Sequence, residues 1–341
     1  MVDGRFSFPS CSSAAREAGI TRYHLPVSKP LPVLVTLGLV LATGVALELG
    51  VSQLYEAPTP MLDKSIEYNS LPHTEPEVVI FGTCLPEQIL QLYLLEQELG
   101  MTSYNLATPA GTSRLMYLVL KNHIPEDSNV QAIVVPYGKR DLTKLMAPYE
   151  SQVMEIAAWD DIPQLIDWAC KDPECETEMW ARKSSRAYRY RGYLANRFWQ
   201  GIGSKPPIPG YVLSPGAVMP EGVGKEPPPN QTGGGAGGRQ AGDSDTDLRY
   251  LAAFLELARD RGIPVVLTPL PERSHVGKGS PPESKEMRAL FDETGAIYLN
   301  VGAVDGLSAG HFEDDVHLNS QGRVLVTKAI GEAVREHLAH P

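Results

Sequence analysis

The chain has 341 residues, of which 43% are hydrophobic and 21% charged, and its formal net charge is −11. This composition excludes wholesale disorder and allows one large domain or two small ones. Nucleic-acid binding is disfavoured, because no long Lys/Arg run offsets the negative charge and phosphate binding needs a concentrated basic surface. We expect no cofactor. We also expect no metal site, because the four cysteines lack Cys-x-x-Cys spacing and clustered histidines.

An apolar run at 31–47 is the first feature along the chain. It contains no charged residue, ends before Glu48, and extends to residue 54 if Glu48 lies at a membrane interface. We expect a transmembrane anchor at 31–54, since thirty residues precede the run, no small-x-small cleavage site follows it, and no polar stripe marks it as a core helix. A cleaved signal peptide and a buried core helix are the alternatives.

Charges on the two sides of the run indicate its orientation. Four basic residues precede it: Arg5, Arg16, Arg22 and Lys29. The first charged residues after it are acidic: Glu48, Glu56 and Asp63. The basic side of a span stays in the cytoplasm, so we expect a single-pass protein of a bacterial inner membrane. Its predicted parts are a cytoplasmic segment at 1–30, the anchor at 31–54, a connector at 55–76 and a periplasmic domain at 77–341.

Strand and helix patterns alternate through the periplasmic part. Strands are predicted at 77–81, 103–107, 130–136, 263–269 and 296–301, and helices at 86–98, 112–122, 246–261, 282–293 and 319–338. The connections are long enough for parallel pairing, which predicts an α/β fold with a doubly wound, flavodoxin-like parallel sheet. A helical and Gly/Pro-rich insertion at 145–247 interrupts the alternation after the third strand.

Two features of the insertion concern its chemistry. Cys170 and Cys175 are close in sequence and could form a disulfide outside the cytoplasm. A basic and aromatic segment follows, and it could contact anionic lipid headgroups or an acidic partner through four arginines: Arg182, Arg186, Arg189 and Arg191. A solvated helix face with tyrosines packed beneath it explains the same segment equally well.

Chemistry-bearing residues follow strands or precede the last helix, and ligands of doubly wound sheets bind at the carboxyl ends of strands. The first strand is followed by Gly82-Thr83-Cys84. The second strand ends within the segment Asn105–Ser113, and the last helix is preceded by Asp314-Asp315-Val316-His317. In a catalytic interpretation Cys84 attacks an acyl carbonyl, His317 is the general base, and Asp314 orients His317. The structural alternatives are a buried cysteine at a tight turn, a helix-capping aspartate and a packed histidine.

Together these blocks resemble those of the SGNH (GDSL-like) hydrolase superfamily, in the same order. The stretches FGTCLPEQIL and YNLATPAGTSR are similar to its membrane-anchored branch, which includes alginate acetylation proteins and the D-alanyl transfer protein of teichoic acids. The resemblance implies Gly111 as an oxyanion donor, with Asn105 and Arg140 as further residues of the substrate site. Two positions depart from the family pattern, since Cys84 stands where Ser is expected and Arg140 where Asn is expected.

Two functions follow from this altered pattern. Losing one oxyanion donor costs on the order of 3 kcal/mol in the transition state. We therefore expect a diverged, non-catalytic domain that acts as an interaction or scaffold subunit of a larger membrane assembly, for example a respiratory or photosynthetic complex. The alternative is an acyl-ester hydrolase or O-acyltransferase that acts on a cell-envelope polymer or lipid through Cys84, His317 and Asp314.

Overall fold

The structure is a computed structural model. It describes residues 30–54, 76–108, 111–138, 142, 150–191, 244–278, 283–300 and 304–339. The chain divides into two compact units, Met1–Leu47 and Glu48–Pro341, which are described separately here.

The apolar run forms helix α1, which spans 25 residues from Pro30 to Leu54. Its described Leu and Val side chains are exposed; Leu39, for example, is 64% exposed. Over the part of the chain that the structure describes, none of the helices combines the length and the hydropathy of a transmembrane span. The side chains at 30–33, 37 and 51–54 lie outside the described residues. The anchor expected at 31–54 is therefore not confirmed and stays a prediction.

A five-stranded, fully parallel sheet forms the centre of the second unit. Its strands are β1 (Val78–Ile80), β2 (Ser103–Asn105), β3 (Ala132–Tyr137), β4 (Val265–Pro269) and β5 (Ile297–Tyr298). They lie in the order β2-β1-β3-β4-β5, each pair parallel. This order confirms the doubly wound, flavodoxin-like α/β fold. Strands β1, β3 and β4 are buried throughout, because helices cover both faces of the sheet.

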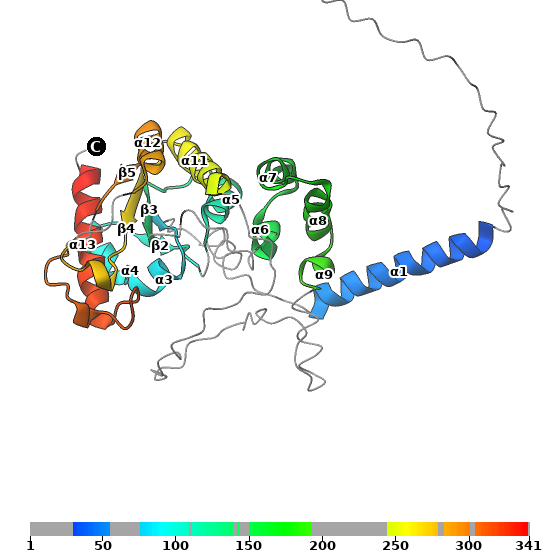
Figure 1. The fold of residues 1–341 in the computed structure, drawn as a ribbon, viewed down its shortest axis with the longest axis horizontal. Helices are drawn as coiled ribbons and strands as arrows, with labels where there is room; N and C mark the ends of the chain where they lie inside the picture. Colours follow the sequence, from blue (N-terminus) through cyan, green and yellow to red (C-terminus); the bar gives the residue numbers. More distant parts are fainter. Residues whose placement is uncertain are drawn as a thin grey trace, which may run out of the picture. The chain divides into compact units, whose positions relative to one another are not determined.

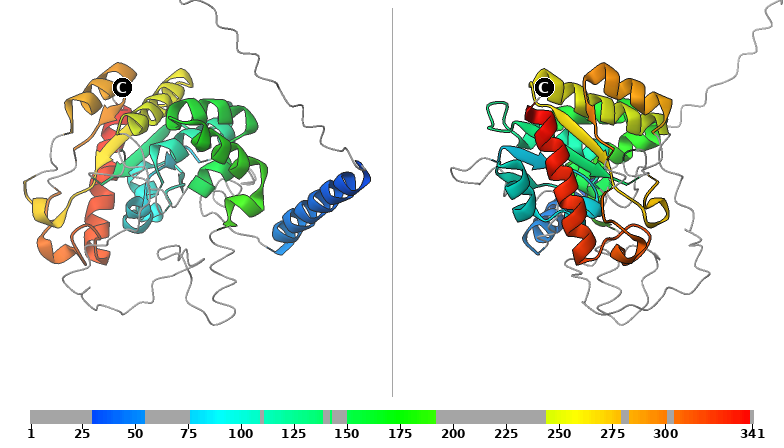
Figure 2. Two further views of the ribbon diagram at one scale, coloured as in Figure 1. Left: turned by 45° about the vertical axis from the view of Figure 1, so that its right-hand side comes forward. Right: turned by 90° about the vertical axis from the view of Figure 1, so that its left-hand side faces the viewer.

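Helices cover the two faces in separate layers (Figures 1 and 2). One face packs against α3 (Cys84–Ile89), α4 (Leu92–Leu99) and α13 (Ser320–Ala339). The other packs against α5 (Ser113–His123), α11 (Ser244–Asp260) and α12 (Lys285–Thr294). Alternate strand residues point to opposite faces, so Val79 and Ile133 join one core while Val78 and Ala132 join the other.

The single helix expected at 86–98 is wrong, because two helices, α3 and α4, occupy this stretch with a break at Leu90 and Gln91. The hydroxyl of Thr327 in α13 causes the break. It donates to the Ile89 carbonyl oxygen at 3.4 Å and accepts the Gln91 N–H at 3.2 Å. A side chain more than 200 positions away thus takes two backbone groups that a continuous helix would use. Gly100 ends α4 with φ +70°, a left-handed conformation that glycine adopts readily.

The described part of the insertion is helical. It contains α6 (Glu150–Ile156), the 3-10 turn η2 (Trp159–Asp161), α7 (Ile162–Ala169), α8 (Pro173–Ser184) and α9 (Arg186–Arg189). Asp161, which is 1% exposed, connects these helices to α5. It pairs with Lys121 and accepts hydrogen bonds from Asn122 Nδ2 and the Ala158 N–H, both at 2.7 Å. The glycine-rich part of the insertion lies outside the described residues.

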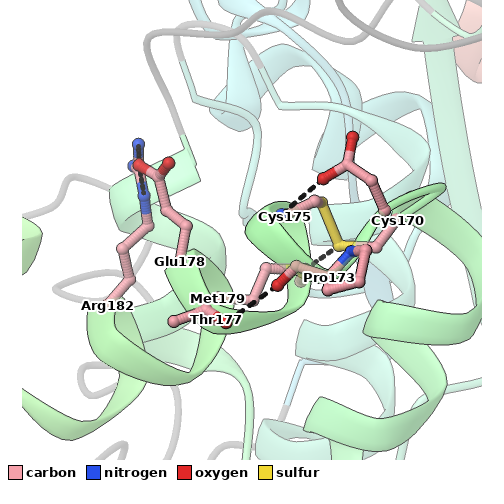
Figure 3. The surroundings of a disulfide bond; sticks show 8 residues. Cys170, Pro173, Cys175, Thr177, Glu178, Met179 and Arg182 are labelled. Atoms are coloured by element: carbon pink, nitrogen blue, oxygen red, sulfur yellow. Dashed lines mark hydrogen bonds and ion pairs between the residues drawn. A yellow bond between two sulfur atoms is a disulfide. The ribbon is translucent and has the colours of Figure 1, made fainter. Parts of the chain in front are cut away.

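The expected Cys170–Cys175 disulfide is present and joins the end of α7 to the first turn of α8 (Figure 3). Asp172 begins α8 by accepting the Cys175 N–H at 2.8 Å, and Pro173 occupies the first helical position. The bond therefore closes a tight corner that local sequence already favours.

Candidate functional site

The loops that follow β1 and β2 pack against each other, backbone to backbone, at the carboxyl edge of the sheet. The Gly82 carbonyl oxygen accepts the Thr108 N–H at 3.2 Å. A Cβ on Gly111 would lie 2.1 Å from that same oxygen. Gly82 itself has φ +149°, and a Cβ there would meet the Pro86 ring and the Pro136 carbonyl oxygen. Only glycine at both positions permits this approach.

The segments that carry Cys84 and His317 reach the same edge. Cys84 begins α3, and His317 lies three residues before the start of α13. These two helices pack on one face of the sheet and are joined by the Thr327 hydroxyl bond to Ile89. The side chain of Cys84 lies outside the described residues, so its distance from His317 stays untested.

Asp314 and His317 form a close pair within a tight loop. His317 Nδ1 lies 2.7 Å from Asp314 Oδ2. The other carboxylate oxygen, Oδ1, accepts the N–H groups of Val316 at 2.8 Å and of His317 at 2.7 Å. An isolated antiparallel β-bridge between Phe312 and Leu318 closes the loop. The carboxylate thus shapes the loop and orients the imidazole at the same time.

The Asp314 carboxylate stays ionised in this setting. Partial burial raises its pKa, but the N–H donors of His317 and Val316 and the His317 ring outweigh burial and hold the pKa below its usual range. A proton on His317 Nδ1 then faces the carboxylate, which leaves Nε2 as the basic nitrogen. This is the arrangement in which a histidine acts as a general base.

The expected oxyanion and substrate residues are engaged within their own loop. The Gly111 N–H donates to the Thr108 carbonyl oxygen at 2.9 Å. Asn105 Oδ1 accepts the Ala107 N–H at 2.8 Å, which forms a turn directly after β2. Arg140 lies outside the described residues. The described site therefore combines an oriented histidine with a loop whose expected donor N–H is already used.

A buried tyrosine at the same edge escaped the sequence analysis as a site feature. Tyr137 ends β3, is 1% exposed, and donates its hydroxyl to Glu283 Oε1 at 2.7 Å. Burial and the neighbouring Glu283 carboxylate raise the pKa of Tyr137. The two residues are 146 positions apart, so no local pattern could have paired them.

The four arginines of the basic segment, defined as residues 182–191, have acidic partners within the chain. Two of them bind Glu178 at 2.7 Å: Arg182 and Arg191. The other two bind Glu155: Arg186 at 3.4 Å, and Arg189, whose side chain is 9% exposed. The expected contact with lipid or an acidic partner stays untested. Each arginine has an acidic partner within the chain, but the two carboxylates balance only two of the four positive charges.

Glu48 makes a contact that the sequence did not predict. Its carboxylate accepts hydrogen bonds from Ser185 Oγ at 2.8 Å, from the Ala187 N–H at 3.2 Å, and from the Arg186 N–H. The first charged residue after the apolar run is therefore joined to the start of α9.

Comparison with known proteins gives only a distant structural match. No family model matches the sequence, and no curated protein matches it. Among solved structures, the chain is similar to a Bacteroides fragilis protein provisionally described as an acylhydrolase. The TM-score is 0.37 at 13% sequence identity, over 81% of this chain and 94% of the other.

Proposed function

We propose that this chain is a membrane-anchored, extracytoplasmic subunit with an SGNH-like fold and a diverged, non-catalytic site. It acts as an interaction or scaffold subunit of a larger membrane assembly, of which a respiratory or photosynthetic complex is one example. The observation that carries the non-catalytic part of this proposal is the hydrogen bond from the Gly111 N–H to the Thr108 carbonyl oxygen, at 2.9 Å. An N–H that stabilises an oxyanion must instead point at the reacting oxygen.

The sequence supports the same conclusion at a second donor. Arg140 stands where the superfamily has an asparagine. Removing one oxyanion donor slows comparable enzymes by about 10²–10³-fold, and two altered donors slow a reaction further. A fold that keeps its core while its donors change is suited to binding rather than to turnover.

Three features support anchoring on the outer side of a membrane. A helix of 25 residues is about 37 Å long, which exceeds the roughly 30 Å hydrocarbon layer of a bilayer. Basic residues precede the run and acidic residues follow it, which favours a cytoplasmic N-terminus. The Cys170–Cys175 disulfide fits an oxidising compartment such as the periplasm.

One observation favours the second candidate function, an acyl-ester hydrolase or O-acyltransferase with Cys84 as its nucleophile. The 2.7 Å contact between His317 Nδ1 and Asp314 leaves Nε2 as a base. A cysteine thiolate beside a histidine base attacks acyl carbonyls. The substrate in this case is an ester on a cell-envelope polymer or lipid.

The decisive experiment measures turnover and assembly with the same variants. Full-length protein purified in detergent is assayed with short-chain acyl esters, beside Cys84→Ala and His317→Ala. We expect no turnover above that of the variants. We also expect both variants to co-purify from native membranes with the same large partners as the wild type. Turnover that disappears in Cys84→Ala would establish the hydrolase instead.

Assembly is tested further by removing the glycine-rich part of the insertion. Deletion of residues 205–245 is expected to weaken co-purification of the partner subunits. Normal assembly of that deletion variant would count against the scaffold.

A further inference from the structure

Side chains of α5 and α8 bind the carbonyl oxygens at the end of α6, which a helix leaves without partners of its own. The Ile156 carbonyl oxygen accepts a hydrogen bond from Asn122 Nδ2 at 3.4 Å and another from the ring of His123. Asn122 and His123 are the last two residues of α5, and we call their contact with Ile156 the α5–α6 junction. Lys183 of α8 donates to two more carbonyl oxygens at the same end. The helical insertion is therefore fastened to α5 at the point where α6 ends.

His123 fits the α5–α6 junction in its neutral form. Its ring donates to the Ile156 carbonyl oxygen, and its Nε2 atom is buried. Protonation would place a hydrogen and a positive charge on that buried nitrogen, which costs free energy. Burial accordingly lowers the pKa of His123, and the hydrogen bond to Ile156 offsets burial only in part.

The charges around the junction do not offset this cost. The charged side chains of the surrounding elements are Lys121 of α5, Glu126 and Asp127 after it, Glu155 of α6, Asp161 of η2, Lys183 of α8, and Arg259, Asp260 and Arg261 at the end of α11. The buried carboxylate of Asp161 already binds Lys121 and Asn122. Among the described groups, only burial and the Ile156 carbonyl oxygen shift the pKa of His123.

We propose that the α5–α6 junction is an acid-sensitive contact: protonation of His123 releases the end of α6 from α5 and loosens the helical insertion from the sheet. The pair between Asp161 and Lys121 keeps the insertion attached, so the change is a local opening and the sheet stays folded. This inference goes beyond the proposed function, and it needs neither a membrane nor the candidate site.

The direction of the pH effect follows from burial. A histidine whose pKa is lowered in the folded state takes up a proton less readily there than in the opened chain. The contact therefore has its full strength above the ordinary histidine pKa. It begins to weaken as the pH falls below that value, and it is weakest below the folded-state pKa.

The test measures hydrogen–deuterium exchange of the full chain in detergent micelles at about pH 7.5 and about pH 5.5, corrected for the effect of pH on exchange itself. On acidification we expect the wild type to lose about threefold or more of its protection in residues 150–156, while the strands keep theirs. His123→Asn should keep its protection at both pH values, because its amide can donate to Ile156 but cannot take up a proton.

The matched control is His337→Asn. His337 also lies in the last turn of its helix, α13, where a positive charge is ordinarily favourable. Helix α13 covers the face of the sheet opposite to α5. His337→Asn should therefore lose the protection of α6 in acid as the wild type does.

Each outcome decides the proposal. A wild type that keeps the protection of α6 in acid overturns it, as does a His123→Asn variant that loses as much as the wild type. Equal loss in the strands would show that acid unfolds the whole unit, which contradicts a local opening.

A second measurement needs no variant and covers the case in which His123→Asn does not fold. Exchange of the ring C2 hydrogen in the wild type reports the pKa of His123 directly. We expect this pKa to lie below the ordinary histidine value. A pKa at or above that value would overturn the proposal.

Discussion

At the scale of single residues, two glycines and one aspartate determine the carboxyl edge of the sheet. Gly82 and Gly111 let the loops after β1 and β2 approach until a carbonyl oxygen occupies the place of a side chain. Asp314 uses one oxygen to hold the loop and the other to orient His317. A helix-capping role for Asp314 was one structural alternative. The structure shows instead that its carboxylate accepts the Val316 and His317 N–H groups and so closes a turn.

The glycine packing yields a prediction. Gly111→Ala should lower the free energy of unfolding by about 1–3 kcal/mol, because its Cβ would lie 2.1 Å from the Gly82 carbonyl oxygen and backbone must shift. Urea denaturation of the two proteins measures the difference. Gly310→Ala is the matched control, since its Cβ would meet only Ser308 Oγ at 3.7 Å. Equal stability of Gly111→Ala and the wild type would contradict the described packing.

At the scale of elements, tertiary contacts decide where helices stop. Thr327 ends α3 by taking the backbone groups of Ile89 and Gln91, although the sequence between residues 86 and 98 favours one continuous helix. In the insertion, the carboxylate of Asp161 is nearly fully buried. Burial is possible because Lys121 of α5 neutralises its charge and Asn122 of the same helix donates a hydrogen bond to it. The insertion helices are thereby joined to the doubly wound core.

The disulfide between α7 and α8 yields the second prediction. Replacing Cys170 and Cys175 together by alanine should lower the free energy of unfolding by about 2 kcal/mol, as expected for a short closed loop. Denaturation with and without a reductant measures it. The wild type should shift to lower denaturant concentration in reductant, and the double variant should not. A reductant shift of equal size in the double variant would place the redox-sensitive bond elsewhere.

At the scale of the whole molecule, residues Glu48–Pro341 form one compact unit around the sheet. The order β2-β1-β3-β4-β5 places the loops after β1 and β3 at a point where the strand order reverses, and ligands or partners of such folds bind there. The buried core is made by this unit, whereas the described Leu and Val side chains of the apolar run are exposed.

The division into units yields the third prediction. A chain of residues 48–341 should unfold in one cooperative transition and partition into the aqueous phase of a detergent extraction. The full chain should partition with detergent, because its apolar run needs a nonpolar environment. Circular dichroism and phase partitioning provide the measurements. Partitioning of the full chain into the aqueous phase would contradict the proposed membrane anchor.

Much of the fold could be predicted from local pattern. The strands at 78–80, 132–137 and 265–269 are apolar throughout, as strands covered on both faces must be, and all three were expected within a few residues. The Cys170–Cys175 pair could also be predicted, because the two cysteines are only a few positions apart.

The sequence by itself determined the doubly wound α/β class, the placement of Asp314 and His317 before the last helix, and the apolar run, since periodicity, motif order and hydropathy are local properties. Only the tertiary structure decided that the Gly111 N–H is used by Thr108, that Glu48 binds the start of α9, and that the arginines of the basic segment are paired. Those contacts join groups in separate loops and helices. Their partners depend on how the chain folds back on itself, which no local pattern records.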